Sequence, residues 1–390
     1  MKKTEAKKKI LFHYMLGIPS GGSDHCLFSL LTHLDNSKYE LYLLYKKESF
    51  FLDYLRKIGI KLIPLLKEHR KNISSNNENK CDDKKTTLKW KFLPVSLKVL
   101  LKLIPETIRL INIILVNKID IIHANHNING DRAVILASIF LRKKIVSHYR
   151  GLYNSIFIDK FIYPFIDKII CISEFSKTEY ISYGIPEKKC KTIYDGVDLK
   201  KFTSFENGTT DNIIIGCVGR LEKWKGQQIL IDAAAILVKT VPNIEFLLVG
   251  NGNNKDDLQN KVKNQNLEKY FEFTGDVTNV KDYMDKCSII VHTSIEPEPF
   301  GMVIIEAMAL GKVVIATNFG GPPEIIENET DGFLIQPSNS TILADYILRL
   351  IKNPELRKQI GINARKKVIS KFDFRETARQ IENIYDEIYE

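Results

Sequence analysis

The sequence lacks the features that mark a membrane-spanning or disulfide-bonded protein. No apolar run in its 390 residues reaches the roughly 18 to 20 residues of a membrane-spanning helix. The basic N-terminus is not followed by the apolar segment and cleavage site of a signal peptide. Its six cysteines are scattered without a C-x-x-C pair, so we expect reduced, buried thiols. Together these absences predict a cytoplasmic protein.

Sequence patterns for cofactors are also missing. The stretch VGNGNNKD, from Val249, begins like a dinucleotide-binding loop, but Lys255 stands where the third glycine belongs. His123 and His126 have no acidic or thiol companion nearby in the sequence, which is poor evidence for a metal site. We therefore expect neither NAD nor a metal, and no other cofactor.

What is present is the composition of a globular protein with an uneven charge. Hydrophobic residues make up 44% of the chain and charged residues 27%, and the length predicts two domains. Residues 1–200 contain 35 lysines and arginines against 20 acidic residues, whereas residues 201–390 contain 22 against 27. The net charge of +10 therefore arises in the first half alone. Such an excess fits an anionic partner or merely a well-solvated face.

Short apolar runs alternate with helical patterns twice along the chain, as parallel sheets with crossover helices require. The predicted strands are 9–14, 39–45, 60–65, 119–123, 144–148 and 168–172 in the first half, and 213–219, 244–249, 270–274, 289–292, 313–317 and 332–335 in the second. This pattern predicts an α/β fold with two Rossmann-like domains facing across a cleft. Ligands of such sheets bind at the carboxyl ends of the strands.

The same pattern sets the domain limits. We place the first domain at residues 1–203 and the second at 204–371, because the segment FENGTTD breaks the alternation there. A polar, low-complexity stretch predicts a mobile insertion at about 67–87. The basic, apolar sequence at 88–118 fits either helices packed on the sheet or a patch lying on a lipid surface, and we favour packing.

The sharpest motif is EPFGMVIIEAMALG, Glu298–Gly311, which follows a predicted strand and opens a helix near Met302. The free amides of Met302 and Val303 at the start of this helix suit a phosphate. Glu298 would project from the loop, and Glu306 would lie about one turn into the helix. One carboxylate can hold ribose hydroxyls, and the other can hold sugar hydroxyls or developing positive charge.

This motif resembles that of the retaining glycosyltransferases of family 4, which have the two-domain fold called GT-B. The E-x7-E motif of that family falls on Glu298 and Glu306 without insertion. The resemblance implies that Glu306 binds the ribose of a nucleotide-sugar, and that Glu298 faces the donor sugar with the backbone around Phe300 and Gly301. It also implies a C-terminal helix, within residues 372–390, that crosses back to the first domain.

A second motif, GRLEKWKG, begins at Gly219 directly after the first strand of the second domain. Arg220 and Lys225 emerge from this loop and are well placed to bracket a diphosphate. The sequence has no D-x-D triplet, so the charge of the leaving group would fall on these cations and on the helix start, without a metal. The same pattern is typical of family 4.

The first domain supplies candidates near its first strand. Gly21 and Gly22 precede a helix, where the backbone can approach a phosphate or an acceptor closely. Family 4 usually has Ala-Glu after these two glycines. Ser23 and Asp24 stand there instead, and we assign them to the acceptor.

Two further segments complete the predicted site. His148 ends a strand in IVSHYRG, where family 4 commonly has a histidine near the donor's phosphate and sugar, and its ring can donate a hydrogen bond. Arg150 would assist with the acceptor. The loop NFGGPPEII resembles loops that border the donor site in the family, which makes Glu324 a secondary donor-binding candidate.

The predicted function is metal-independent sugar transfer, with retention, from a UDP- or GDP-sugar to a hydroxyl of a saccharide or lipid-linked saccharide. We expect a role in cell-surface polysaccharide or lipopolysaccharide synthesis, with the basic first domain against an anionic inner membrane face and no nucleic-acid partner. Two alternatives stay open: a nucleotide-sugar epimerase or hydrolase of the same fold, and a non-catalytic sugar-binding subunit.

Overall fold

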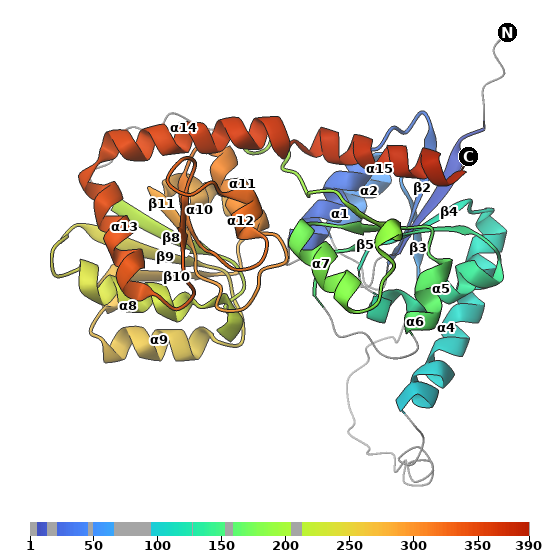
Figure 1. Ribbon diagram of the computed structural model, residues 1–390, viewed down its shortest axis with the longest axis horizontal. Helices are drawn as coiled ribbons and strands as arrows, with labels where there is room; N and C mark the ends of the chain where they lie inside the picture. The colour runs from blue at the N-terminus through green and yellow to red at the C-terminus, as the bar shows by residue number, and fades with distance from the viewer. Residues whose placement is uncertain are drawn as a thin grey trace, which may run out of the picture.

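The computed structural model describes residues 6–13, 22–45, 50–65, 95–126, 128–152, 159–203 and 213–389. The insertion predicted at 67–87 and the candidate Gly21 lie outside these residues. The described part of the chain forms two α/β domains, each built on its own parallel sheet (Figure 1). The boundary predicted between 203 and 204 adjoins an undescribed stretch and stays a prediction.

The first sheet has seven strands in the order β3-β2-β1-β4-β5-β6-β7, all paired in parallel. They are β1 (Lys8–His13), β2 (Tyr39–Tyr45), β3 (Lys61–Pro64), β4 (Ile121–Ala124), β5 (Lys144–Tyr149), β6 (Lys168–Cys171) and β7 (Cys190–Thr192). Its helices are α1 (Gly22–His33), α2 (Phe50–Lys57), α4 (Val95–Asn117), α5 (Ile128–Phe140), α6 (Asp159–Ile162) and α7 (Glu174–Ser182). Side chains of α1 and α2 pack into the core on one face, and those of α4 to α7 on the other.

The second sheet has the order β10-β9-β8-β11-β12-β13 and is also parallel. Its strands are β8 (Ile213–Val218), β9 (Ile244–Val249), β10 (Phe271–Gly275), β11 (Ile289–His292), β12 (Val313–Thr317) and β13 (Phe333–Ile335). Its helices are α8 (Gln227–Leu237), α9 (Lys255–Asn264), α10 (Val280–Lys286), α11 (Met302–Ala309), α12 (Pro322–Ile325), α13 (Ser340–Lys352) and α14 (Pro354–Lys371). The cores on its two faces contain α8, α9 and α13 on one side and α10, α11 and α12 on the other.

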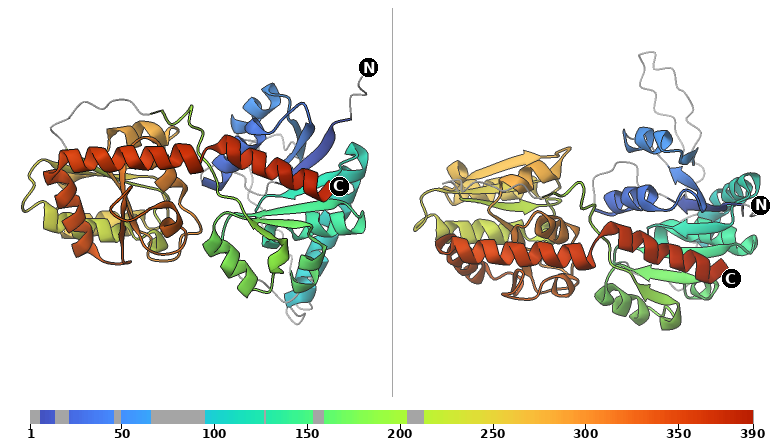
Figure 2. Two further views of the ribbon diagram at one scale, coloured as in Figure 1. Left: turned by 45° about the horizontal axis from the view of Figure 1, so that its top comes forward. Right: turned by 90° about the horizontal axis from the view of Figure 1, so that it is seen from above.

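The chain returns to the first domain through α15 (Phe374–Tyr389), which buries Phe374, Ile381 and Tyr385 beside α1. Figure 2 shows α14 and α15 running end to end along both domains. The two segments that connect the domains lie beside each other. The Val197 amide of one donates to the Phe372 carbonyl of the other at 2.8 Å. We call these paired segments, residues 194–202 and 372–374, the hinge.

The predicted fold class is confirmed, including the returning C-terminal helix. All predicted strands are present, with ends within two residues of those observed. The three-residue strand β7 was not predicted.

Candidate active site

A partly buried ion pair joins the two motifs of the second domain. Lys225 ends the short 3-10 helix that follows β8, and its Nζ contacts the carboxylate of Glu298. His292 ends β11 with its Nε2 3.1 Å from the same carboxylate oxygen, and the Ser294 hydroxyl lies 3.3 Å from it. All three contacts use Oε2, and among the described residues no hydrogen bond to Oε1 is formed. One oxygen of the carboxylate is thus held by the protein, and the other can accept a hydrogen bond from a ligand.

The charge state of Glu298 follows from these neighbours. Burial alone would favour the neutral acid, but Lys225 and His292 outweigh it and hold the pKa of Glu298 well below its usual range. Glu298 is therefore an anion at any physiological pH. His292 and Ser294 were missed in the sequence, although both lie where β11 ends, the position at which such sheets place ligand contacts.

The start of α11 has the free amides that the sequence predicted. Gly301 precedes the helix with φ of 125°, a conformation open to glycine, and caps it with no side chain. Among the described residues no carbonyl or side chain accepts from the amides of Met302 and Val303. These two N–H groups, at the positive end of the helix dipole, can bind an anion.

Glu306 lies on α11 one turn beyond these amides and is only half-buried. Its carboxyl group has no hydrogen-bond partner among the described residues. Burial raises the pKa of Glu306 to about 7, and the charge of Lys201 opposes the rise only in part. This carboxyl group can therefore accept hydrogen bonds from the hydroxyl groups of a ligand.

Both cationic side chains predicted to bind the diphosphate lie near the same aromatic ring. Arg220 is exposed, with its guanidinium 5.8 Å from the centre of the Trp224 ring, and Lys225 Nζ lies 4.2 Å from the same ring. The sequence analysis did not select Trp224, because it considered only the charged residues of this motif. Gly219 begins this loop with φ of 144°, and a side chain on Gly250 would lie 2.2 Å from the Gly219 carbonyl oxygen. The loop is therefore closely fitted against the end of β9.

The first domain contributes the start of α1. A Cβ on Gly22 would lie 3.1 Å from the Met302 side chain, and Cys26 Sγ lies 3.4 Å from Met302 Sδ. The N-termini of α1 and α11 thus face each other across the domain interface. Ser23 is half-buried and Asp24 buried near this contact.

His148 is the second-last residue of β5 and lies inside a buried polar network. Its Nδ1 lies 3.3 Å from Arg150, and its Nε2 has no partner among the described residues. Burial, and then the charge of Arg150, lower the pKa of His148 well below its ordinary value, so the ring is neutral. Arg150 itself is paired with Asp195 at 2.5 Å and bonds to Asn125, all three being buried. Arg150 therefore ties β5 to the hinge segment, and its side chain is not presented to solvent.

His123 contacts the C-terminal helix of the chain. Nδ1 of His123 lies 2.7 Å from the Tyr385 hydroxyl, which fastens α15 to β4. Within the described ranges no group of three or more His, Cys, Asp or Glu side chains could hold a metal ion.

The last candidate, Glu324, spans the domain interface. Its carboxylate accepts the backbone amides of Glu174 and Phe175, the first two residues of α7, at 2.8 and 2.7 Å. In this arrangement Glu324 bonds to the first domain, at the edge of the loop that carries Glu298.

Two family models match successive parts of the chain. The model described as Glycosyltransferase Family 4 matches residues 20–201, and the model described as Glycosyl transferases group 1 matches residues 200–367. A solved structure of Anabaena Alr3699/HepE in complex with UDP-glucose is 25% identical with a TM-score of 0.77, and the alignment covers 97% of this chain and 99% of that one.

Curated relatives match over a shorter length. The N-acetyl-alpha-D-glucosaminyl L-malate synthase of Bacillus anthracis is 31% identical over 214 residues, 52% of this chain and 55% of that protein. The N-acetylgalactosamine-N,N'-diacetylbacillosaminyl-diphospho-undecaprenol 4-alpha-N-acetylgalactosaminyltransferase of Campylobacter jejuni is 29% identical over 220 residues, 55% and 59% of the two chains. The chain thus spans less than two thirds of the length of these relatives.

Proposed function

The chain belongs to glycosyltransferase family 4, and from this premise we propose that it transfers a sugar, with retention, from a nucleotide diphosphate-sugar to a hydroxyl group. The observation that carries the proposal is the convergence of three features where β8, β11 and α11 meet. They are the Lys225–Glu298 pair, the amides of Met302 and Val303, and the carboxyl of Glu306, the last three groups having no hydrogen-bond partner within the described part of the chain.

Each feature suits one part of the donor. Glu306 would accept hydrogen bonds from ribose hydroxyls, and the open Oε1 of Glu298 would accept one from the donor sugar, with the backbone around Phe300 and Gly301 beside it. The α11 amides, with Arg220 and Lys225, would surround the diphosphate, and the backbone of Gly22 and Gly219 would border it. These groups supply positive potential without a metal, which supports metal-independent transfer.

In the reaction, the bond from the anomeric carbon to the diphosphate oxygen would break, and the acceptor oxygen would form a bond to that carbon on the same face. The proton of the acceptor hydroxyl would go to the departing diphosphate oxygen. The electron pair of the broken bond leaves with the diphosphate, whose charge Arg220 and Lys225 would stabilise. The anionic Glu298 would stabilise oxocarbenium character in the sugar. The neutral ring of His148 would donate a hydrogen bond to a sugar oxygen.

The relatives narrow the choice of substrates within this proposal. The UDP-glucose complex of the Anabaena protein supports a UDP-sugar donor, with a GDP-sugar as the alternative. The name of the Campylobacter relative gives a saccharide linked to diphospho-undecaprenol as its acceptor. This supports a saccharide or lipid-linked saccharide as the acceptor here. We propose a role in cell-surface polysaccharide or lipopolysaccharide synthesis.

Association with an anionic membrane face is supported by α4. No helix among the described residues is long and apolar enough to cross a membrane. α4 buries Leu110 and Ile114, as expected of a packed helix, yet Ile108, Leu115 and Val116 are 62%, 55% and 71% exposed. An exposed apolar edge on the more basic half of the chain fits an anionic lipid surface.

The test of the membrane proposal compares two exposed isoleucines. Ile108→Glu should reduce sedimentation of the protein with vesicles that contain phosphatidylglycerol, because it puts a negative charge in the apolar edge. Ile362→Glu on α14, where Ile362 is 40% exposed, is the matched control and should leave binding unchanged. Equal binding of both variants and the wild type to the vesicles would show that α4 does not contact the lipid surface.

The test of the donor proposal is a thermal-shift screen of nucleoside diphosphates and their sugars, because a ligand that binds only the folded protein raises its melting temperature. We expect a shift with UDP-glucose or a GDP-sugar. Epimer formation from the donor alone would favour the epimerase alternative. Donor binding without turnover across an acceptor panel would favour the non-catalytic one.

A further inference from the structure

The N-terminus of α7 is completed by a residue from the other domain. Ser173 caps the helix, with its hydroxyl accepting from the Ser176 amide at 3.0 Å, and the Ser176 hydroxyl accepts from the Ser173 amide. The other two amides at the start of α7, those of Glu174 and Phe175, have no acceptor within the helix, and both donate to the Glu324 carboxylate. The first domain alone offers these amides no acceptor among its described residues, so the cap is complete only while the two domains touch.

Glu324 follows a loop that is bonded to the donor loop, the segment that carries Glu298. The Gly321 amide donates to the Glu298 carbonyl at 2.7 Å, and Gly320 forms a backbone bridge with Glu298. A Cβ on Gly320 would lie 2.3 Å from the Glu298 carbonyl oxygen, and one on Gly321 would lie 2.6 Å from Phe300. Side chains on these glycines would push the two loops apart. A displacement of α12 would therefore be transmitted to the loop that holds Glu298.

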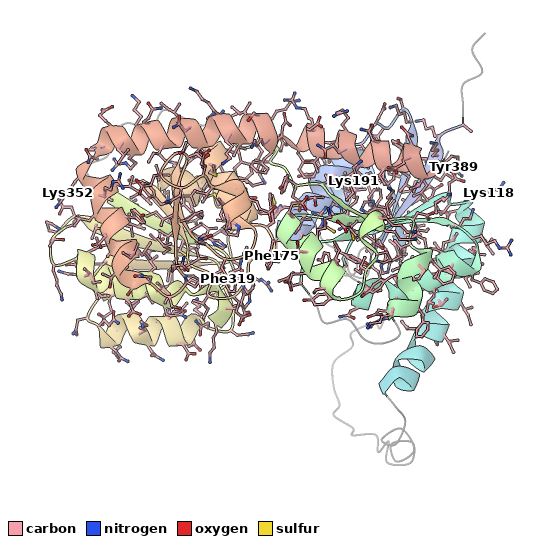
Figure 3. The ribbon with its side chains drawn as sticks, in the orientation of Figure 1. Lys118, Phe175, Lys191, Phe319, Lys352 and Tyr389 are labelled. Carbon is pink, nitrogen blue, oxygen red and sulfur yellow. The ribbon has the colours of Figure 1, made fainter. Side chains whose placement is uncertain are left out.

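A second contact joins the same two places. The Ser173 hydroxyl donates to the carbonyl of Pro299 at 2.6 Å, next to Glu298 in sequence. Figure 3 labels Phe175, on α7, and Phe319, on the facing loop of the second domain. The start of α7 thus meets both the loop with Pro299 and the helix with Glu324.

The hinge lies close to this contact. The Tyr194 ring stacks on Phe300 with centres 5.8 Å apart and meets the edge of Phe372 at the start of the returning segment. Burial, together with the nearby carboxylate of Glu324, raises the pKa of the Tyr194 hydroxyl. The donor loop, the hinge and the Glu324 contact are therefore one packed unit.

We propose that Glu324 is a positioning residue that holds the domains closed by bonding to the N-terminus of α7, and that this closure sets the donor loop around Glu298. The carboxylate is favoured there by the two amides and by the helix dipole. Closure and the geometry of the donor site are then coupled, because both depend on the same loop. Only the predicted effect on turnover rests on the proposed function.

The experiment compares Glu324→Ala and Glu324→Gln with the matched control Glu327→Gln. Glu327 is exposed, three residues away, and its side chain has no contact with the first domain among the described residues. Hydrogen exchange of the peptide containing Glu174 and Phe175 is measured without ligand, as is the radius of gyration by X-ray scattering. Donor affinity and turnover are measured in parallel.

In Glu324→Ala we expect exchange at these two amides to be faster on the order of tenfold, as loss of a charge-assisted cap of about 1.4 kcal/mol implies. The radius of gyration should increase, and turnover should fall more than donor affinity. Glu324→Gln, which keeps its shape and one acceptor, should lie between Ala and the wild type. Glu327→Gln should match the wild type.

Unchanged exchange and scattering in both Glu324 variants would overturn the proposal whatever their activity. Altered exchange and scattering in variants of a protein that transfers no sugar would leave the Glu324 contact established and refute the proposed function instead. If Glu324→Ala fails to fold, the isosteric Glu324→Gln decides the question by the same two measurements.

Discussion

The ionisation of Glu306 leads to a specific dependence of donor affinity on pH. Burial raises the pKa of this carboxyl to about 7 in the free protein. Ribose hydroxyls donate more strongly to a carboxylate than to the neutral acid, so the donor favours the ionised form. Affinity should therefore rise as pH increases through 7.

The size of the effect follows from the fraction ionised. With a pKa of about 7, roughly a tenth of the molecules carry the carboxylate at pH 6 and roughly nine tenths at pH 8. The dissociation constant scales inversely with the competent fraction, so it should fall up to about tenfold over this range. A nucleotide diphosphate-sugar has no group of its own that titrates there.

Calorimetric titration of UDP-glucose, or of the sugar nucleotide found by thermal shift, provides the assay. Repeating the titration at pH 7 in buffers of different ionisation enthalpy should reveal net proton release on binding. Glu306→Gln should bind weakly at every pH and release no proton from this position. The same pH slope in the wild type and in Glu306→Gln would refute the reasoning, because the titrating group would then lie elsewhere.

Two other changes test the ion pairs Lys225–Glu298 and Arg150–Asp195. Lys225→Met should lower turnover by at least about a hundredfold, as removal of one preorganised electrostatic contact does elsewhere, and should also lower the melting temperature because the partly buried Glu298 loses its cation. Initial rates and thermal unfolding check this prediction, and an unchanged rate would contradict it. Asp195→Ala should lower the free energy of unfolding by about 3 to 5 kcal/mol, because Arg150 stays buried without a counter-charge; denaturant unfolding measures it, and a loss below about 1 kcal/mol would show that the pair is not what stabilises the hinge.

The strands of the fold could be predicted because their residues form short buried apolar runs bounded by turn signals. β12, for example, is buried at every position. β7 could not, since only three residues, Cys190–Thr192, pair along β6 and none is fully buried. A single short pairing at a sheet edge leaves no periodic pattern in the sequence.

Candidate residues could be identified from the sequence where a motif lies within one loop and the helix that follows it. Glu298, Glu306 and Lys225 were found from motifs, and the structure brings Lys225 and Glu298 into direct contact. Contacts between distant segments were not predictable. Arg150 was expected to face the acceptor but pairs with Asp195, and Glu324 bonds to a helix of the other domain. Such pairings depend on how the sheets and domains pack, which local sequence does not record.

The central claim is tested most directly by acceptor-dependent release of nucleoside diphosphate from UDP- and GDP-sugars, with the wild type and Lys225→Met side by side. A panel of saccharide and lipid-linked saccharide acceptors is supplied, and the anomeric configuration of any product is read by NMR. We predict release that requires an acceptor, a product with the donor's configuration, and loss of both in Lys225→Met. Release that is independent of any acceptor, or that is equal in the variant, would contradict the account.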